Sequence, residues 1–121
     1  MSPQEKAEII KDFVRYAKSE LGIETLPKIK LVNDQKFATS HHSFGSYRPE
    51  SVELNVYVKN RNTADILRTL AHELVHHRQN ELGMDMDGTS GSEVENQANS
   101  IAGVLMRNYG RANERIYEGK K

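Results

Sequence analysis

One helical pattern, between Asn62 and Gly83, constrains the fold most, because it indicates both which side of a helix is buried and what the other side carries. Asn62 can cap the N-terminus of this helix, and Gly83 can end it. At about 100° per residue, the apolar residues cover one half of the helix. His72 and His76 fall on the opposite half, and Glu73 lies at the border. The pattern therefore predicts an amphipathic helix that presents two histidines and a glutamate beside its buried face.

Residues 72–76 of this helix read His-Glu-Leu-Val-His, which is the pattern H-E-x-x-H. Two histidines four residues apart are neighbours on a helix and can both reach one zinc ion at about 2.0–2.1 Å. Glu73 is placed to accept a proton from a zinc-bound water without being a ligand itself. The alternative is that these are ordinary polar residues facing solvent, which is the position we expect for His77. Pattern and helix together favour the metal site.

A catalytic zinc needs a third protein ligand, and the sequence restricts what this can be. The chain has no cysteine, and no histidine follows His77. The third ligand must therefore be a carboxylate, or a histidine from upstream, where His41 and His42 lie. The downstream candidates are Glu81, Asp85, Asp87, Glu93 and Glu95.

A helix from about Ser92 to Tyr109 discriminates between the last two candidates. Glu95 borders its apolar stripe, whereas Glu93 faces away, so Glu95 is favoured as the ligand. Ser92 and Glu95 can also be read as a capping box, in which Glu95 only closes the helix start. Residues 90–93, Ser-Gly-Ser-Glu, offer a capping box one register earlier, which would leave the carboxylate of Glu95 free to bind a metal. Asn99, four residues after Glu95, is placed to hold a zinc-bound imidazole by its other nitrogen.

The other segments predict an α+β fold in one domain, residues 1–121. Residues 2–22 have a capping box, proline at the first helical position and a terminal glycine, which predicts an N-terminal helix. Residues 28–33 alternate like a strand, and residues 43–48 and 51–58 flank a Pro-Glu turn like a hairpin. Residues 110–121 are polar and weakly patterned, so we expect a loosely packed tail.

Composition narrows the function classes. Lys and Arg total 17 and Asp and Glu total 17, giving a formal net charge of zero, which disfavours a nucleic-acid partner. The chain shows neither a signal-peptide pattern nor the roughly 20 apolar residues of a membrane span. We therefore expect a cytoplasmic protein with no membrane partner.

The motifs HELVH and, in the next helix, ENQAN resemble the minimal gluzincin-type zinc metallopeptidases. The tract EVENQANSIAGVLM is similar to the E-x-x-A-N-x-x-A helix of the ImmA/IrrE-type peptidases, and small HExxH proteins encoded by tailed phages look similar throughout. The resemblance covers about residues 43–108. It implies one Zn²⁺ held by His72, His76 and Glu95, with Glu73 as general base for peptide hydrolysis.

The same resemblance implies an α+β fold in which a small antiparallel sheet lies above the zinc helix. Together with the elements read from the residues, it predicts a minimal zincin fold with an N-terminal helix, a small three-stranded, mostly antiparallel sheet, the HExxH helix and a C-terminal helix with the third ligand. Residues 43–47 would pair with the substrate backbone. An oxyanion donor could be Tyr47, His42 or Tyr109, of which Tyr47 is favoured because it belongs to this strand. We expect a monomeric endopeptidase with a polypeptide substrate, in the host cytoplasm if phage-encoded. The alternatives are a catalytically silent, zinc-bound peptide-binding module and a phage assembly component.

Overall fold

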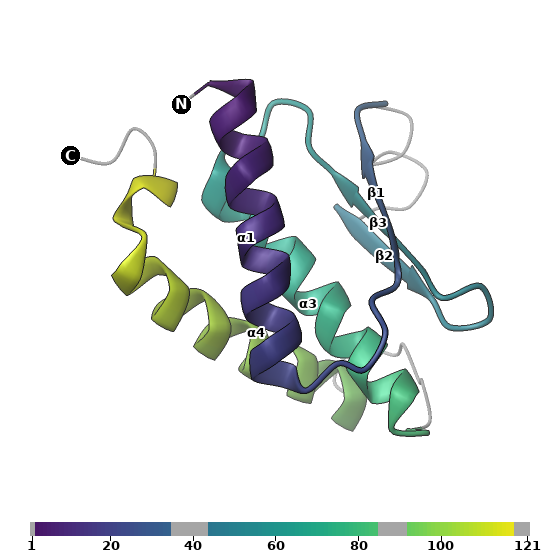
Figure 1. Cartoon of the computed structure of the whole chain (residues 1–121). Coiled ribbons are helices and arrows are strands. Elements are labelled where there is room, and N and C mark those ends of the chain that lie inside the picture. The colour runs from purple at the N-terminus through teal and green to yellow at the C-terminus, as the bar shows by residue number, and fades with distance from the viewer. Residues whose placement is uncertain (1, 35–43, 85–91, 118–121) are drawn as a thin grey trace.

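The computed structural model describes residues 2–34, 44–84 and 92–117 (Figure 1). The fold is α+β, as predicted, with three long helices and a small sheet. Its elements in chain order are α1 (Pro3–Leu21), β1 (Lys28–Val32), β2 (Gly45–Arg48), β3 (Glu53–Tyr57), α3 (Thr63–Glu81), α4 (Glu93–Ala112) and a 3-10 turn, η1 (Glu114–Ile116).

Local sequence signals determine both ends of α1. The Ser2 side chain accepts a hydrogen bond from the backbone N–H of Glu5, and the Glu5 side chain accepts one from Ser2, which completes the predicted capping box. Gly22 ends the helix in the left-handed conformation, at φ 73°. The buried stripe of α1 consists of Ile9, Ile10, Phe13, Val14 and Ala17.

The sheet has the strand order β1-β3-β2, so β3 is its central strand. β2 and β3 pair antiparallel, which confirms the predicted hairpin. β1 pairs parallel with β3, so the sheet is mixed and not mostly antiparallel. The alternating pattern of β1 indicates which face of a strand is buried, but it carries no information on the direction of the neighbouring strand. Among the described residues, the order of the strands makes β1 and β2 the edges of the sheet.

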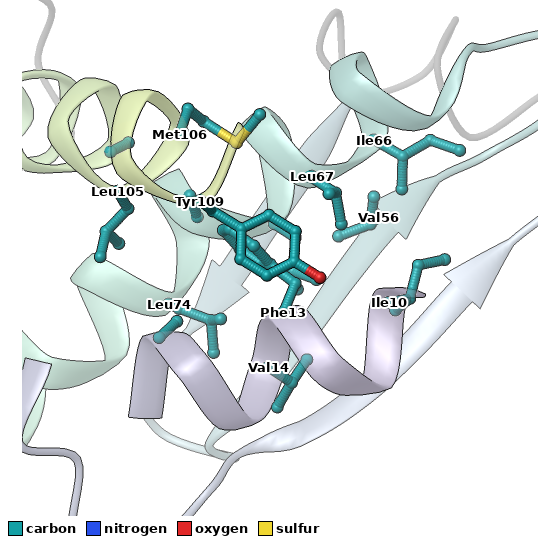
Figure 2. Packing of buried hydrophobic residues seen from close by; sticks show 14 of the residues in the cluster. Ile10, Phe13, Val14, Val56, Ile66, Leu67, Leu74, Leu105, Met106 and Tyr109 are labelled. Atoms are coloured by element: carbon teal, nitrogen blue, oxygen red, sulfur yellow. The ribbon is translucent and has the colours of Figure 1, made fainter. Parts of the chain in front are cut away.

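α3 is the centre of the molecule, because it contacts α1, α4, β2 and β3 (Figure 1). Its leucines at 67, 70 and 74 are fully buried. Tyr109 of α4 and Phe13 of α1 meet edge to face, with ring centroids 5.0 Å apart, in the core shown in Figure 2. Helices on one side and the sheet on the other thus enclose α3, which leaves it little solvent-facing surface.

The expected loose tail is wrong for residues 110–117. α4 continues to Ala112, and Ile116 in η1 is fully buried in the core. Ile116 and the partly buried Tyr117 are two adjacent apolar residues in a polar tract, so they produce no periodic pattern, yet both pack against the core and anchor the turn. Within the described residues, no helix is long and apolar enough to cross a membrane.

Candidate metal centre

The side chains of His72, His76 and Glu95 converge between α3 and α4. His72 Nε2 lies 3.1 Å from Glu95 Oε1, and His76 Nε2 lies 2.9 Å from Glu95 Oε2. The two Nε2 atoms are 3.1 Å apart. Ligands about 2.0–2.1 Å from a tetrahedral zinc ion lie roughly 3.3 Å from one another. The three donor groups therefore fit a single small metal ion, as predicted from the sequence.

The start of α4 explains why Glu95 is free to join the histidines. Ser92 is the N-cap, and its hydroxyl accepts a hydrogen bond of 3.2 Å from the backbone N–H of Glu95. This cap uses the backbone of Glu95, while its carboxylate contacts the two imidazoles. The capping and ligand roles, which looked exclusive in the sequence, are thus compatible.

The other carboxylate candidates do not join the cluster, as far as they are described. Glu93 is exposed. Glu81 accepts hydrogen bonds from the backbone N–H groups of Glu24 and Thr25, which hold the loop after α1. Asp85 and Asp87 lie outside the described residues, as do both upstream histidines, 41 and 42.

Gln79 fixes which nitrogen of His76 carries the proton. The amide nitrogen of Gln79 lies 3.0 Å from the carbonyl oxygen of Val94 and 2.8 Å from Gln97 Oε1. A backbone carbonyl only accepts hydrogen bonds, so Oε1 of Gln79 must be the atom that faces His76 Nδ1, at 2.7 Å. Nδ1 of His76 therefore donates, so in the neutral imidazole Nε2 directs a lone pair into the cluster. This is the tautomer in which an imidazole binds a metal through Nε2.

The sequence analysis missed Gln79, which is 2% exposed and on α3 itself. Its spacing of three residues from His76 is a signal that helix geometry could have used. The spacing alone does not show that Val94 and Gln97 of α4 orient the amide of Gln79.

Asn99 of α4 lies next to His72, and its side chain makes a hydrogen bond to the imidazole. That Asn99 holds His72 by the nitrogen facing away from the metal stays a prediction. Burial lowers the pKa of His72 and the neighbouring His76 lowers it further, although Glu95 acts in the opposite direction. The neutral imidazole is therefore favoured, which suits a metal ligand. A cation would relieve the close approach of two imidazole nitrogens and a carboxylate.

Glu73 is buried beside the cluster and not within it. Burial raises its pKa to about 8, and the negative charge of Glu95 adds to this effect. Gly45 of β2 lies against it, since a Cβ at Gly45 would be 3.0 Å from Glu73 Oε2. Next to these two residues is an open cavity of about 280 Å³, which reaches His72.

Tyr47, the predicted oxyanion donor, makes its contacts on another side of α3. Its hydroxyl lies 2.8 Å from His77 Nδ1 and accepts a hydrogen bond of 3.0 Å from Asn80 Nδ2. The alternative Tyr109 donates to Asp12 of α1 and belongs to the helix core. The catalytic role of Tyr47 stays a prediction, with its hydroxyl bonded to residues outside the metal cluster.

The expected surface position of His77 is wrong, because this residue is 2% exposed. Its Nε2 lies 2.6 Å from the carbonyl oxygen of Thr25, to which it must donate. Nδ1 then accepts from the hydroxyl of Tyr47. His77 thus links α3 to both β2 and the loop after α1.

Comparisons with known proteins identify no relative. No protein-family model, no curated protein and no solved structure matches this chain.

Proposed function

We propose that this protein is a zinc-dependent endopeptidase. The observation that carries the proposal is the convergence of His72, His76 and Glu95 at zinc-ligand distances, with the buried carboxyl of Glu73 beside them. The likeness of HELVH and ENQAN to the gluzincin-type peptidases supports the same assignment.

Zinc bound at this site would supply a Lewis acid that polarises a peptide carbonyl and makes water a better nucleophile. Glu73 would accept a proton from the attacking water and deliver it to the amine nitrogen of the departing peptide. Burial raises the pKa of this carboxyl in the metal-free protein, and a bound Zn²⁺ would lower it toward the ionised form that accepts a proton. Gln79 and Asn99 would keep the two imidazoles in their metal-binding orientation.

The position of β2 supports a polypeptide substrate. β2 is an edge strand, and its Gly45 lies directly against Glu73, so an extended peptide paired with this edge would pass the proposed base. The neutral net charge and the absence of a basic excess disfavour nucleic acid.

The first experiment compares zinc content and cleavage of an unstructured protein for wild type, Glu73→Gln and Glu93→Gln. We expect Glu73→Gln to bind zinc and to lose at least about a hundredfold in kcat/KM. Glu93→Gln is the matched control, since Glu93 is exposed on α4, and it should cleave normally. Zinc binding without any cleavage by wild type would favour the silent binding module. Full activity of Glu73→Gln would exclude Glu73 as the base.

The second experiment tests the third ligand by Glu95→Ala, again with Glu93 as control. Losing one of three protein ligands should weaken zinc binding by several orders of magnitude, as measured by competition with a chromophoric chelator. Unchanged zinc affinity would exclude Glu95. No bound metal in wild type, after purification without chelator and addition of zinc, would refute the proposed function.

Tyr47→Phe tests the oxyanion prediction. Removal of a donor to the oxyanion costs about 10²–10³ in kcat, whereas removal of a structural hydrogen bond costs about 1 kcal/mol of stability. From the contacts of Tyr47 with His77 and Asn80, we expect the second result.

A further inference from the structure

We propose that the cavity beside Glu73 is a subsite for an aromatic side chain of the peptide substrate, with Phe44 as its specificity-determining residue. This inference rests on the proposed peptidase function and adds the substrate class to it. The cavity of about 280 Å³ is lined by Phe44, Gly45, Arg68, Thr69, His72 and Glu73. It is slightly smaller than the roughly 300–1,000 Å³ typical of small-molecule pockets, so it has room for one side chain of a longer ligand.

Phe44 offers an aromatic surface at this cavity. Phe44 is 51% exposed, more than any other large apolar residue in or next to the described strands. Its backbone carbonyl accepts a hydrogen bond of 2.8 Å from the N–H of Tyr57, which extends the pairing of β2 with β3 by one residue. The ring therefore has a defined place one residue before Gly45, next to the proposed base.

Arg61 holds the ring of Phe44 in place. The guanidinium carbon lies 4.3 Å from the ring centroid, within the range of a cation–π contact. Arg61 itself is fixed by hydrogen bonds to the carbonyl oxygens of Tyr57 and Asp65, at 2.9 and 3.0 Å, and to Thr69 Oγ1, at 2.8 Å. The Tyr57 ring stacks on Phe44 at a centroid distance of 6.1 Å. The exposed ring is thus preorganised, which lowers the entropy cost of binding on it.

Two of the polar lining groups, Thr69 and Arg68, already have partners within the protein. The hydroxyl of Thr69 is bonded to Arg61, and Arg68 is paired with Asp65 at 3.1 Å. Gly45 contributes no side chain and leaves the approach to the ring open. Phe44 is thus the exposed apolar group of the lining, and a second aromatic ring would pack against it in an offset or edge-to-face geometry.

The test uses two readouts. The first maps, by mass spectrometry, the bonds that the zinc-loaded wild type cleaves in an unstructured protein. The second measures fluorescence anisotropy of labelled peptides on zinc-loaded Glu73→Gln; the peptides are identical except for one central Phe, Ala or Glu. Each readout is repeated with Phe44→Ala and with the control Leu31→Ala. Leu31 is 46% exposed and lies on β1, the opposite edge of the sheet.

We expect aromatic residues at one fixed position beside the cleaved bonds, and a roughly tenfold tighter binding of the Phe peptide than of the Ala peptide. Both preferences should disappear in Phe44→Ala and persist in Leu31→Ala. Cleavage that depends on Glu73 but shows no aromatic preference would overturn the subsite and leave the peptidase function intact. A preference for the Glu peptide would also overturn it.

If wild type cleaves nothing, the peptidase function fails, and the binding readout decides the subsite alone. Tighter binding of the Phe peptide that requires Phe44 would then support an aromatic-binding site without turnover. Equal binding of the three peptides would refute the subsite as well.

Discussion

Replacing Gly45 with alanine should force β2 away from α3 at the proposed site. An added Cβ would lie 2.6 Å from Thr69 Cγ2, 3.0 Å from Glu73 Oε2 and 3.2 Å from Glu73 Cγ. The side chain of Thr69 cannot easily move away from the added methyl group, because its hydroxyl accepts a hydrogen bond from Arg61. Overpacking of this kind costs about 1–3 kcal/mol, and with the closest contact at a restrained methyl group we expect about 2 kcal/mol. In a domain of this size that lowers Tm by roughly 8 °C.

A second substitution separates the two neighbours of Gly45. Thr69→Ser removes the Cγ2 methyl and keeps the hydroxyl that binds Arg61. In the double variant the closest contact is gone, so stability should recover by about 1–2 kcal/mol relative to Gly45→Ala. The contacts with Glu73 remain in both proteins, so we expect a roughly tenfold loss of kcat/KM in Gly45→Ala and the same loss in the double variant.

The assay is urea unfolding followed by far-UV circular dichroism, together with kcat/KM on an unstructured protein. Gly103→Ala in α4 is the matched control, because nothing lies within 4 Å of an added Cβ there. Because alanine favours the helix more than glycine does, Gly103→Ala should raise the free energy of unfolding by up to about 1 kcal/mol. Wild-type stability of Gly45→Ala, or no recovery in the double variant, would refute the close approach of β2 to α3.

Three further predictions concern α3. In the zinc-free protein, Glu73 has a pKa of about 8, against an ordinary value of 4.5. As pH rises, Glu73 therefore loses its proton in the unfolded chain before it does so in the folded protein. The free energy of unfolding consequently falls between about pH 4.5 and 8. Relative to Glu73→Gln, wild type should lose about 3 kcal/mol by pH 7, measured by urea unfolding at each pH; parallel pH profiles of the two proteins would contradict this. Gln79→Met should weaken zinc binding about 10–100-fold by chelator competition, since His76 loses its acceptor, and an unchanged Kd would exclude that role. His77→Leu should cost about 2–4 kcal/mol of stability, because it breaks buried hydrogen bonds to Thr25 and Tyr47, while zinc affinity changes little; a wild-type Tm would contradict it.

The parts of the fold that were predictable depend on residues close in sequence. Ser2 and Glu5 cap α1 from three residues apart, and Gly22 ends it. The spacing of His72 and His76 brings their Nε2 atoms to 3.1 Å. Each of these relations follows from the geometry of one helix.

The burial of His77 shows where such reasoning stops. A helical projection of α3 places it near the border of the apolar half, and a polar residue there is ordinarily solvated. β2 and the loop after α1 instead cover this side of the helix and supply its hydrogen-bond partners, Tyr47 and Thr25. A polar residue is buried when its partners are buried with it, and those partners lie 30 and 52 residues away.

The sequence by itself determined the helices, the hairpin, and the pair of histidines with a glutamate between them, because these depend on backbone geometry over a few residues. Only the tertiary structure decided that Glu95 completes the cluster, that Gln79 orients His76, and that β1 runs parallel to β3. The physical reason is that a periodic pattern specifies the face a side chain occupies. The group it meets on that face is set by packing between elements distant in the chain.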